Sequence, residues 1–352
     1  MTIKIITGKL INQERWDTYI LTAPNASPYH LYGWGVAVEN AYGFTCYRFA
    51  AIKEDEIVGV LAIINMRSLR GKKLLSALPY CDIGGIIADN KDVYSVLQTH
   101  LLNFAENLGI AELEIRNSES EVKDLKKVTS GEKVRMFLDL PSSEEALMEQ
   151  FKSKLRSQIR KAEKNGLRYE VVMGSAIKTQ ELESFYEIIA KNMKALGSPV
   201  HSKQWYKEVI SQYGSHAYMA IVYSENVVVG AGLVLTLGNK ASIPWASTLN
   251  EYNRLAPNML LYWAVLAQAT KQGISTFDFG RSTVGEGTFN FKKQWGCLPI
   301  KLQWQSFRNG EALIELPSKS SPSRDKLASA WRCLPLPVAN FLGPILRRYI
   351  SL

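Results

Sequence analysis

One segment in the second half of the chain holds the residues best suited to chemistry. Phe277-Asp278-Phe279 alternates aromatic and acidic side chains, so a strand here would place both rings on one face and the carboxylate on the other. Asp278 can then hold Arg281 in register as a structural ion pair, or accept a proton from a nucleophile. Lys292 and Lys293 follow, and because neighbouring side chains point apart, we expect at most one of them to face a ligand.

The sequence offers little for covalent catalysis or for metal binding. It contains neither a G-x-S-x-G elbow nor an H-E-x-x-H motif. Its four cysteines are scattered without a C-x-x-C spacing, which disfavours a zinc site and a disulfide framework. We therefore expect no metal and no resident cofactor, and an enzyme that aligns two substrates and stabilises charge instead of forming an enzyme-bound intermediate.

Length and composition are those of an ordinary globular protein with two domains. The chain has 352 residues, of which 46% are apolar and 21% are charged. Its net charge of +9 favours polyanionic partners such as tRNA, nucleotide-sugar pyrophosphates or anionic lipid, without choosing among them. The first residues lack the apolar run of a signal peptide, and no stretch of about 20 apolar residues is present, so we expect a cytoplasmic protein.

A pattern of strand, Pro-aromatic turn, helix, glycine and strand occurs twice. This duplication implies two like domains with a cleft at their junction, where ligands usually bind. The first copy consists of Val58–Ala62, Pro79-Tyr80, a helix over Tyr94–Leu108, Gly109 and Ile110–Arg116. The second consists of Val229–Leu233, Pro244-Trp245, a helix over Met259–Thr270, Gly273 and Ile274–Arg281.

Strand–helix–strand units of this kind predict an α+β protein with mixed sheets flanked by helices. A doubly wound dinucleotide fold is disfavoured because no G-x-G-x-x-G follows a strand and opens a helix. Gly285-Glu286-Gly287 follows a predicted strand, but Phe289-Asn290-Phe291 after it does not read as the repeat of a helix.

Composition divides the chain into a first domain over 1–140, a second over 141–316, and a linker with an apolar, basic tail over 317–352. The second domain should open with a helix, because Ser142 and Glu145 form a capping-box pattern and Asn165-Gly166 is a good C-terminal cap. A basic stripe at four-residue spacing follows this helix and is either a solvated face or a contact for tRNA or another polyanion. It consists of Lys152, Arg156, Arg160 and Lys164.

The tail begins with a polar linker over Ser318–Ser323 and then becomes apolar and basic. Three prolines should break it into short pieces, at Pro335, Pro337 and Pro344. Its composition suits docking on an anionic membrane surface, and it suits packing on the protein's own surface equally.

The segment around Lys292 resembles the late signature of the Fem-type aminoacyltransferases (the FemAB family). The matching residues are Asp278, Gly280, Phe291-Lys292 and Trp295-Gly296. The helix over Phe151–Lys164 is similar to the stretch that opens the second domain of these enzymes, and Tyr32-x-Trp34 sits where they carry an early aromatic near the substrate pocket. The resemblance spans residues 10 to 305 and implies a tandem duplication of the GNAT (acyl-CoA N-acyltransferase-like) fold that transfers amino acids from aminoacyl-tRNA to peptidoglycan precursors.

Within that family, three stretches are most similar to a subgroup associated with exosortase (PEP-CTERM) and exopolysaccharide systems. They are Pro244-Trp245-Ala246-Ser247, Pro257–Trp263 and Phe277–Ser282. The resemblance therefore implies an acceptor in cell-envelope or exopolysaccharide assembly, with a glycan or peptide-glycan precursor as partner.

Three departures from the family bear on mechanism. In Arg254–Met259, where GNAT enzymes hold the CoA pyrophosphate, Pro257 removes an N–H donor and Met259 adds bulk where glycine is expected. The charged hairpin arm that some Fem enzymes use for tRNA is missing. Lys194 stands where an Arg would bind a nucleotide sugar, so the acceptor need not be a UDP-muramyl peptide.

We expect an amine of the acceptor to attack an activated acyl carbon, in an aminoacyl-tRNA ester or an acyl thioester. Lys292 would stabilise the oxyanion or neutralise a donor phosphate, with Asp278 and Arg281 as the other catalytic residues. The expected substrate-binding residues are Tyr32, Trp34, Lys194, Trp245, Tyr252 and Phe291. The alternatives are an N-acyltransferase that uses acyl-CoA or an acyl carrier, and a non-catalytic binding module. Such a protein would work in the cytoplasm, where the tail could hold it at the inner face of the cell membrane.

Overall fold

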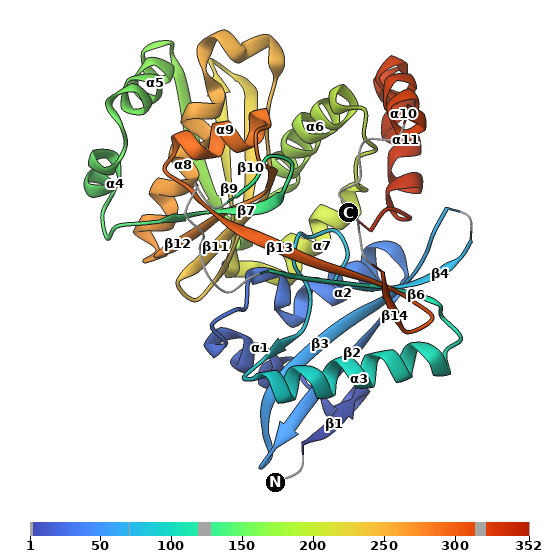
Figure 1. Ribbon diagram of the computed structural model, residues 1–352. Coiled ribbons are helices and arrows are strands. Elements are labelled where there is room, and N and C mark those ends of the chain that lie inside the picture. The colour runs from blue at the N-terminus through green and yellow to red at the C-terminus, as the bar shows by residue number, and fades with distance from the viewer. Residues whose placement is uncertain (1–2, 70, 119–127, 314–321, 352) are drawn as a thin grey trace. The chain divides into compact units, whose positions relative to one another are not determined.

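A computed structural model describes residues 3–69, 71–118, 128–313 and 322–351 (Figure 1). The predicted linker lies largely outside these residues. The chain divides into two compact units, each with its own sheet. The first unit comprises 1–121, 301–318 and 348–352, and the second comprises 122–300 and 319–347.

The first unit is a mixed sheet with helices packed on it. Among the strand pairs described for it, β4 and β6 are parallel and the others are antiparallel. The strands are β1 (Lys4–Thr7), β2 (Thr45–Lys53), β3 (Glu56–Arg67), β4 (Lys73–Ala77), β5 (Ile87–Ala88), β6 (Glu112–Ser118), most of β13 (Leu298–Arg308) and β14 (Glu311–Leu313). The helices are α1 (Gln13–Thr22), α2 (Tyr32–Tyr42) and α3 (Lys91–Asn107).

Helix α3 forms because its apolar residues recur every fourth position and both ends are capped. The side chain of Asn90 accepts hydrogen bonds from the N–H groups of Asp92 and Val93, and the chain leaves the helix at Gly109 with φ +62°. The apolar face of α3 packs on β2, β3 and β4 in one cluster. That face consists of Val93, Leu97, Leu101 and Ala105, all buried.

The second unit has the same plan. Its strand order is β7-β12-β11-β10-β9-β8, and only the β11–β12 pair is parallel among the strand pairs described for it. The strands are β7 (Lys133–Asp139), β8 (Leu167–Met173), β9 (Ala217–Ser224), β10 (Val227–Leu237), β11 (Lys240–Thr248) and β12 (Thr276–Thr283). The helices are α4 (Glu144–Gln150), α5 (Ser153–Lys164), α6 (Thr179–Leu196), α7 (Lys203–Tyr213), α8 (Pro257–Lys271), α9 (Gly287–Gln294), α10 (Pro322–Cys333) and α11 (Leu336–Arg347).

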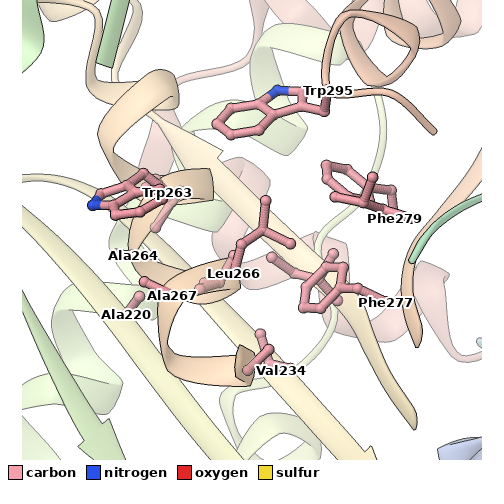
Figure 2. Close-up of a cluster of buried hydrophobic side chains, with 14 of the residues drawn as sticks. Ala220, Val234, Trp263, Ala264, Leu266, Ala267, Phe277, Phe279 and Trp295 are labelled. Atoms are coloured by element: carbon pink, nitrogen blue, oxygen red, sulfur yellow. The ribbon is translucent and has the colours of Figure 1, made fainter. Parts of the chain in front are cut away.

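Helix α8 is the centre of the second core. It packs on the sheet together with two rings of β12, Phe277 and Phe279, and with Trp295, which follows α9 (Figure 2). Tyr218 of β9 donates its hydroxyl to the carbonyl of Val265 at 2.7 Å, which satisfies a polar group inside this apolar layer. The strand–helix–strand unit β11–α8–β12 repeats β4–α3–β6 of the first unit, which confirms the predicted duplication and the α+β class with mixed sheets flanked by helices.

The predicted helix that opens the second domain is two helices. Its N-cap is Ser143, whose hydroxyl accepts from the N–H of Ala146, and not Ser142. Phe151 adopts extended backbone angles (φ −75°, ψ 143°) and ends α4, because this places its ring edge-to-face against Trp263 and Trp295 in the core. Burial of an aromatic ring outweighs the small propensity for continuing the helix.

Three other local expectations differ from the structure. Pro244-Trp245 is not a turn but lies inside β11, beside a shift of the β10–β11 register between Leu233 and Leu235, where a missing N–H is tolerated. A short helix, α9, does begin at Gly287. Pro344 lies within α11 and does not break it. In addition, β7 belongs to the second unit, since it pairs with β12.

Candidate functional site

Strands β11 and β12 run side by side for only three residues and then diverge. Lys240–Ser242 pairs with Thr276–Asp278. In the described part of the chain, no strand pairs with the β12-facing edge of the remainder of β11, Ile243–Thr248. Main-chain N–H and C=O groups on such an edge can hydrogen-bond an extended ligand, as an added strand would. The open edge of β11 is the first element of the candidate site.

Helix α8 begins beside this edge in the connection from β11. Its N-cap, Ala256, has the left-handed angle φ +64°, and Pro257 is the first helical residue. The N–H of Met259 donates to the carbonyl of Ala256 at 3.0 Å. Pro257 has no N–H and that of Met259 is engaged, so this helix start offers fewer donors to a phosphate than a glycine-rich loop does.

A buried ion pair lies where the two strands part. Asp278 is 2% exposed and accepts from Arg135 of β7, at 2.5 Å from Nη2 and 3.1 Å from Nε. The hydroxyl of Ser242 also donates to this carboxylate at 3.3 Å. Lys240 is near the same pair, and burial, followed by the charge of Arg135, lowers the pKa of its ammonium. Loss of either partner would leave an uncompensated buried charge, so the ion pair is a fixed feature of the site.

Lys292 and Asp278 together hold a bulge in β12. Gly280 has φ +75°, an angle that glycine adopts without strain, and the pairing with β7 shifts between Asp278 and Arg281. The N–H of Gly280 donates to Asp278 Oδ1 at 2.8 Å. On the other side, Lys292 Nζ donates to the carbonyls of Gly280 at 3.0 Å and Arg281 at 2.8 Å. The matched residues Asp278, Gly280 and Lys292 therefore form one hydrogen-bonded unit.

The predicted pairing of Asp278 with Arg281 is replaced by another ion pair, whereas Lys292 and Lys293 do point in different directions. The ion-pair partner of Asp278 is Arg135, 143 residues away in the sequence, which sequence reasoning missed because strand register over that distance cannot be read from the chain. Arg281 is half-buried, and its carbonyl is held by Lys292. Lys292 is 7% exposed and Lys293 is exposed, as expected for neighbouring residues that point apart.

Burial disfavours the reactive thiolate form of two cysteines, Cys297 and Cys46. Burial raises the pKa of Cys297, which outweighs the lowering effect of the Lys292 cation. Burial likewise raises the pKa of Cys46 to about 12. A thiol needs to be a thiolate to attack, so these cysteines are inert at neutral pH. Among the residues that the structure describes, no three His, Cys, Asp or Glu side chains come together as a metal site.

Three aromatic residues named from the sequence lie in the second unit. Trp245, on the open strand β11, is half-buried and makes edge-to-face contacts with Trp205 at 6.2 Å and Tyr206 at 5.0 Å between ring centroids. Phe291 contacts Tyr262 and packs on the core with one side. Tyr252 is also packed on that core. Of the three, Trp245 is the best placed to line a ligand on the edge.

Lys194 of α6 lies beside a cavity of about 360 Å³ at the end of β11. Its Nζ donates to the main-chain oxygen of Arg332 in α10 at 2.7 Å. Asn192 joins the cavity to the strand, because its Nδ2 donates to Ser247 Oγ at 2.8 Å. The lining residues come from α6, from the end of β11 and the turn after it, and from the α10–α11 connection. They include Lys191, Asn192, Lys194, Asn250, Glu251 and Leu334–Leu336.

Tyr32 and Trp34 lie in the first unit. Trp34 is fully buried, and its indole N–H donates to the carbonyl of Pro79 at 3.0 Å, so it is a core residue and cannot stack on a substrate as expected. Tyr32 is half-buried, with the guanidinium of Arg48 3.9 Å from its ring centroid. The guanidinium covers one face of the Tyr32 ring, so that face is not available to a substrate.

The basic stripe is on the outer face of α5. Lys152, Arg160 and Lys164 are exposed, and Arg156 donates to the carbonyl of Glu149 at 3.4 Å. The opposite face is buried and consists of Leu155, Ile159 and Ala162. The stripe is therefore accessible to a polyanion, and it is equally what a solvated helix face looks like.

The corresponding place in the first unit is filled by the chain itself. β4 and β6 pair over Leu74–Ser76 and Glu112–Glu114, and then the segment after β4 lies against β6. The N–H groups of Gly84 and Gly85 donate to the carbonyl of Arg116 at 3.1 and 2.9 Å. Ser351 accepts from the N–H of Tyr80 at 2.7 Å and from Arg116 Nη1 at 2.8 Å. This part of β6, the counterpart of β12, is therefore covered by the protein's own chain.

A family of known proteins matches the part of the chain that contains the candidate site. Residues 149–293, less than half of the chain, match the family described as acetyltransferase (GNAT) domain. This stretch contains β11, α8, β12 and most of α9. No curated protein has a significantly similar sequence.

Solved structures share the fold at low sequence identity. The crystal structure of FemX is 15% identical, with a TM-score of 0.64 over 88% of this chain and 96% of that one. A tandem GNAT protein from the clavulanic acid biosynthesis pathway is 10% identical, with a TM-score of 0.54 over 88% and 99% of the two chains. L-PGS from Bacillus licheniformis is 10% identical, with a TM-score of 0.53 over 92% and 98%. The protein has a tandem GNAT fold, as the resemblance implied.

Proposed function

We propose that this protein is an acyl- or aminoacyl-transferase that forms an amide on a cell-envelope precursor. An amine of the acceptor attacks the activated carbon directly, without a covalent enzyme intermediate. The match of residues 149–293 to the GNAT acetyltransferase domain supports group transfer to an amine. The raised pKa of the buried Cys297 thiol argues against this cysteine as an enzyme nucleophile.

The observation that carries this proposal is the open edge of β11 beside the start of α8. An extended donor arm can pair with the main chain of Ile243–Thr248 and bring its acyl carbon to the point where β11 and β12 part. In the first unit, Gly84 and Gly85 lie against β6, the counterpart of β12, so the second unit is the donor site in this proposal.

The reaction then follows from charge and position. The amine attacks the carbonyl carbon of an ester or thioester, and negative charge develops on the carbonyl oxygen. Collapse forms the amide and breaks the C–O or C–S bond, and the leaving oxygen or sulfur takes up the proton that the amine loses. Lys292 supplies the positive charge that offsets the oxyanion, an effect worth roughly 3 to 4 kcal/mol. Asp278 is a positioning residue, because it holds Arg135 and the N–H of Gly280.

The acceptor is a glycan or peptide-glycan precursor of the peptidoglycan or exopolysaccharide type, as the PEP-CTERM-associated subgroup suggests. Arg281 and Lys194 bind its anionic groups, and Trp245 stacks on it. Lys194 exchanges its bond to the carbonyl of Arg332 for a bond to the ligand. If the donor is aminoacyl-tRNA, the exposed cations of α5 hold its backbone. The enzyme works in the cytoplasm, at the inner face of the cell membrane.

A second candidate is an N-acyltransferase that uses acyl-CoA. The GNAT domain match favours it. The start of α8 argues against binding of the CoA pyrophosphate, because Pro257 has no N–H and the N–H of Met259 donates to the carbonyl of Ala256. A non-catalytic binding module is the third candidate, since the bonds among Asp278, Gly280 and Lys292 give these residues a structural use even without catalysis.

Mass spectrometry of envelope and polysaccharide intermediates separates these candidates. Intermediates from cells with the protein are compared with those from cells that lack it and from cells that carry Lys292→Met. We expect one intermediate to lose the mass of an aminoacyl or acyl group in both altered strains. Unchanged intermediates in all strains would exclude the transferase. A thermal shift with CoA in the wild type would instead favour the acyl-CoA candidate, and this shift should grow in Pro257→Gly, which restores an N–H donor.

A further inference from the structure

Helix α11 carries an apolar ridge that faces solvent. Val338, Phe341 and Ile345 are 40%, 72% and 49% exposed, and Leu342 between them is half-buried. These residues are spaced i, i+3, i+4 and i+7, which places them on one side of a helix. Single exposed apolar side chains are ordinary, but a row that includes a largely exposed phenylalanine is not.

The other side of the same helix is fixed to the second unit, so the ridge is held in place. Ala339 and Gly343 are buried, and a Cβ added to Gly343 would lie 3.1 Å from Val200. At the end of α11, Arg347 Nε donates to His201 Nε2 at 3.0 Å. A fixed helix with a small-residue face inward and a large apolar face outward presents a surface for docking.

The net charge of α10 and α11 indicates what the ridge docks on. From Pro322, where α10 begins, to the last residue, the sequence has five basic residues and one acidic residue, Asp325, in a protein of net charge +9. Lys326 and Arg332 are exposed. Apolar side chains flanked by cations are the pattern by which helices lie in the surface of an anionic bilayer.

We propose that the ridge of α11 docks the protein on an anionic membrane surface, with Phe341 inserted among the acyl chains. No helix in the described ranges is long and apolar enough to cross a membrane, so the contact lies in the plane of the surface. This proposal rests on α10 and α11 alone and does not require the proposed transferase activity.

Docking would also bring one cavity of the second unit close to lipid headgroups. The α10–α11 connection, Leu334–Leu336, forms one wall of the cavity that holds Lys194 and Lys191. A lipid-linked anion could then reach these ammonium groups without leaving the surface. The class of ligand that follows is an anionic, lipid-anchored molecule.

Co-sedimentation of the full-length protein with vesicles tests the proposal. One set of vesicles is phosphatidylcholine alone, and the other also contains phosphatidylglycerol. We expect the protein to sediment with the anionic vesicles and to remain in solution with the neutral ones. The double variant Phe341→Glu with Ile345→Glu should bind at least about tenfold more weakly.

The matched control places the same charges on exposed leucines of the first unit. Leu10→Glu with Leu69→Glu changes residues that are 69% and 60% exposed, and it should leave vesicle binding unchanged. Because all four side chains are exposed, both variants should keep the unfolding temperature of the wild type. Equal binding of wild type and the α11 variant, or no binding of wild type, would overturn the proposal.

Analytical ultracentrifugation tests whether a second copy of the protein, and not a membrane, covers the ridge. If the wild type forms a dimer that dissociates in the α11 variant, the ridge is an interface between copies and the membrane proposal is wrong.

A charge reversal, Lys326→Glu with Arg332→Glu, should weaken binding to anionic vesicles and reduce its dependence on salt. Binding that ignores both this reversal and the salt concentration would contradict the electrostatic part of the proposal.

Discussion

The two units share a strand–helix–strand plan but use it differently. In each, a parallel pair of strands flanks the central helix, and the two strands pair over three residues, Leu74–Ser76 with Glu112–Glu114 and Lys240–Ser242 with Thr276–Asp278. Beyond that point, the segment after β4 lies against β6 in the first unit, whereas in the second unit no described strand pairs with the β12-facing edge of β11. Duplication of a fold therefore does not duplicate a site.

The difference begins at the same dipeptide type in both units. Pro79-Tyr80 turns the chain, with Tyr80 at φ +69°, and the N–H of Tyr80 is then bound to Ser351. Pro244-Trp245 continues as strand, with Trp245 paired to Leu233. A turn directs the chain back over β6, while an extended backbone carries β11 past β12.

The largest expected effect is the loss of the buried ion pair. Asp278→Asn removes the charge that compensates Arg135, whose side chain is 5% exposed, so the free energy of unfolding should fall by about 3 to 5 kcal/mol. The comparison is Glu170→Gln, which breaks the exposed pair with Arg168 and should cost less than about 1 kcal/mol. Urea unfolding of both variants measures the difference. Equal costs would mean that Asp278 is not an essential support of the second unit.

The next effect concerns Lys292. Lys292→Met should reduce turnover about a hundredfold or more, and it should also destabilise the fold by about 1 to 3 kcal/mol for each carbonyl left without a donor. Both main-chain oxygens, of Gly280 and Arg281, lose their bond. Lys293→Met, at an exposed position, is the control and should change neither quantity much. Unfolding curves and the mass-spectrometric assay report the two quantities separately, and full turnover in Lys292→Met would remove it from the reaction.

A smaller effect on stability should show how tightly the segment after β4 packs against β6 in the first unit. A Cβ added to Gly85 would lie 1.9 Å from Asn117 Oδ1 and 2.9 Å from the carbonyl of Arg116, so Gly85→Ala should cost about 1 to 3 kcal/mol. In the second unit, a Cβ on Gly232 meets nothing closer than Ile243 Cδ1 at 3.3 Å. Gly232→Ala should therefore cost less than Gly85→Ala in thermal or urea unfolding. The reverse order would show that the segment over β6 is loosely packed.

The smallest effect is a pH dependence at the C-terminal segment, which attaches to the first unit through Ser351 and to the second through His201. Burial, followed by the charge of Arg347, lowers the pKa of His201 well below 6.5. Between that lowered pKa and 6.5 the unfolded chain binds a proton that the folded chain does not, so stability should rise with pH there, by at most about 1.4 kcal/mol per unit.

His201→Gln keeps an acceptor for Arg347 but cannot titrate. The slope of stability against pH below 6.5 should therefore be smaller in this variant than in the wild type. Unfolding by urea at several pH values measures it. Identical slopes would show that His201 is already open to protons in the folded protein.

Much of the fold could be predicted because it is local. The helix over Lys91–Asn107 follows from apolar residues at four-residue spacing between Asn90 and Gly109, and α8 and β12 follow from similar patterns. Predictions failed where a tertiary contact overrode a local signal. Phe151 interrupts a helix to reach the core, and Trp34, whose type suits a ligand pocket, is fully buried.

For the candidate site, the sequence determined which residue types are present and which of them are close in the chain. Asp278, Gly280, Arg281 and Lys292 fall within one short segment, so their proximity needed only a strand and the helix after it. The tertiary structure alone decided that Arg135 neutralises Asp278 and that Lys292 holds two carbonyls. It also decided that Gly84 and Gly85 lie against β6 while no described strand pairs with the end of β11. The physical reason is that strand register and chain closure depend on pairing between residues far apart in the sequence, which no local pattern encodes.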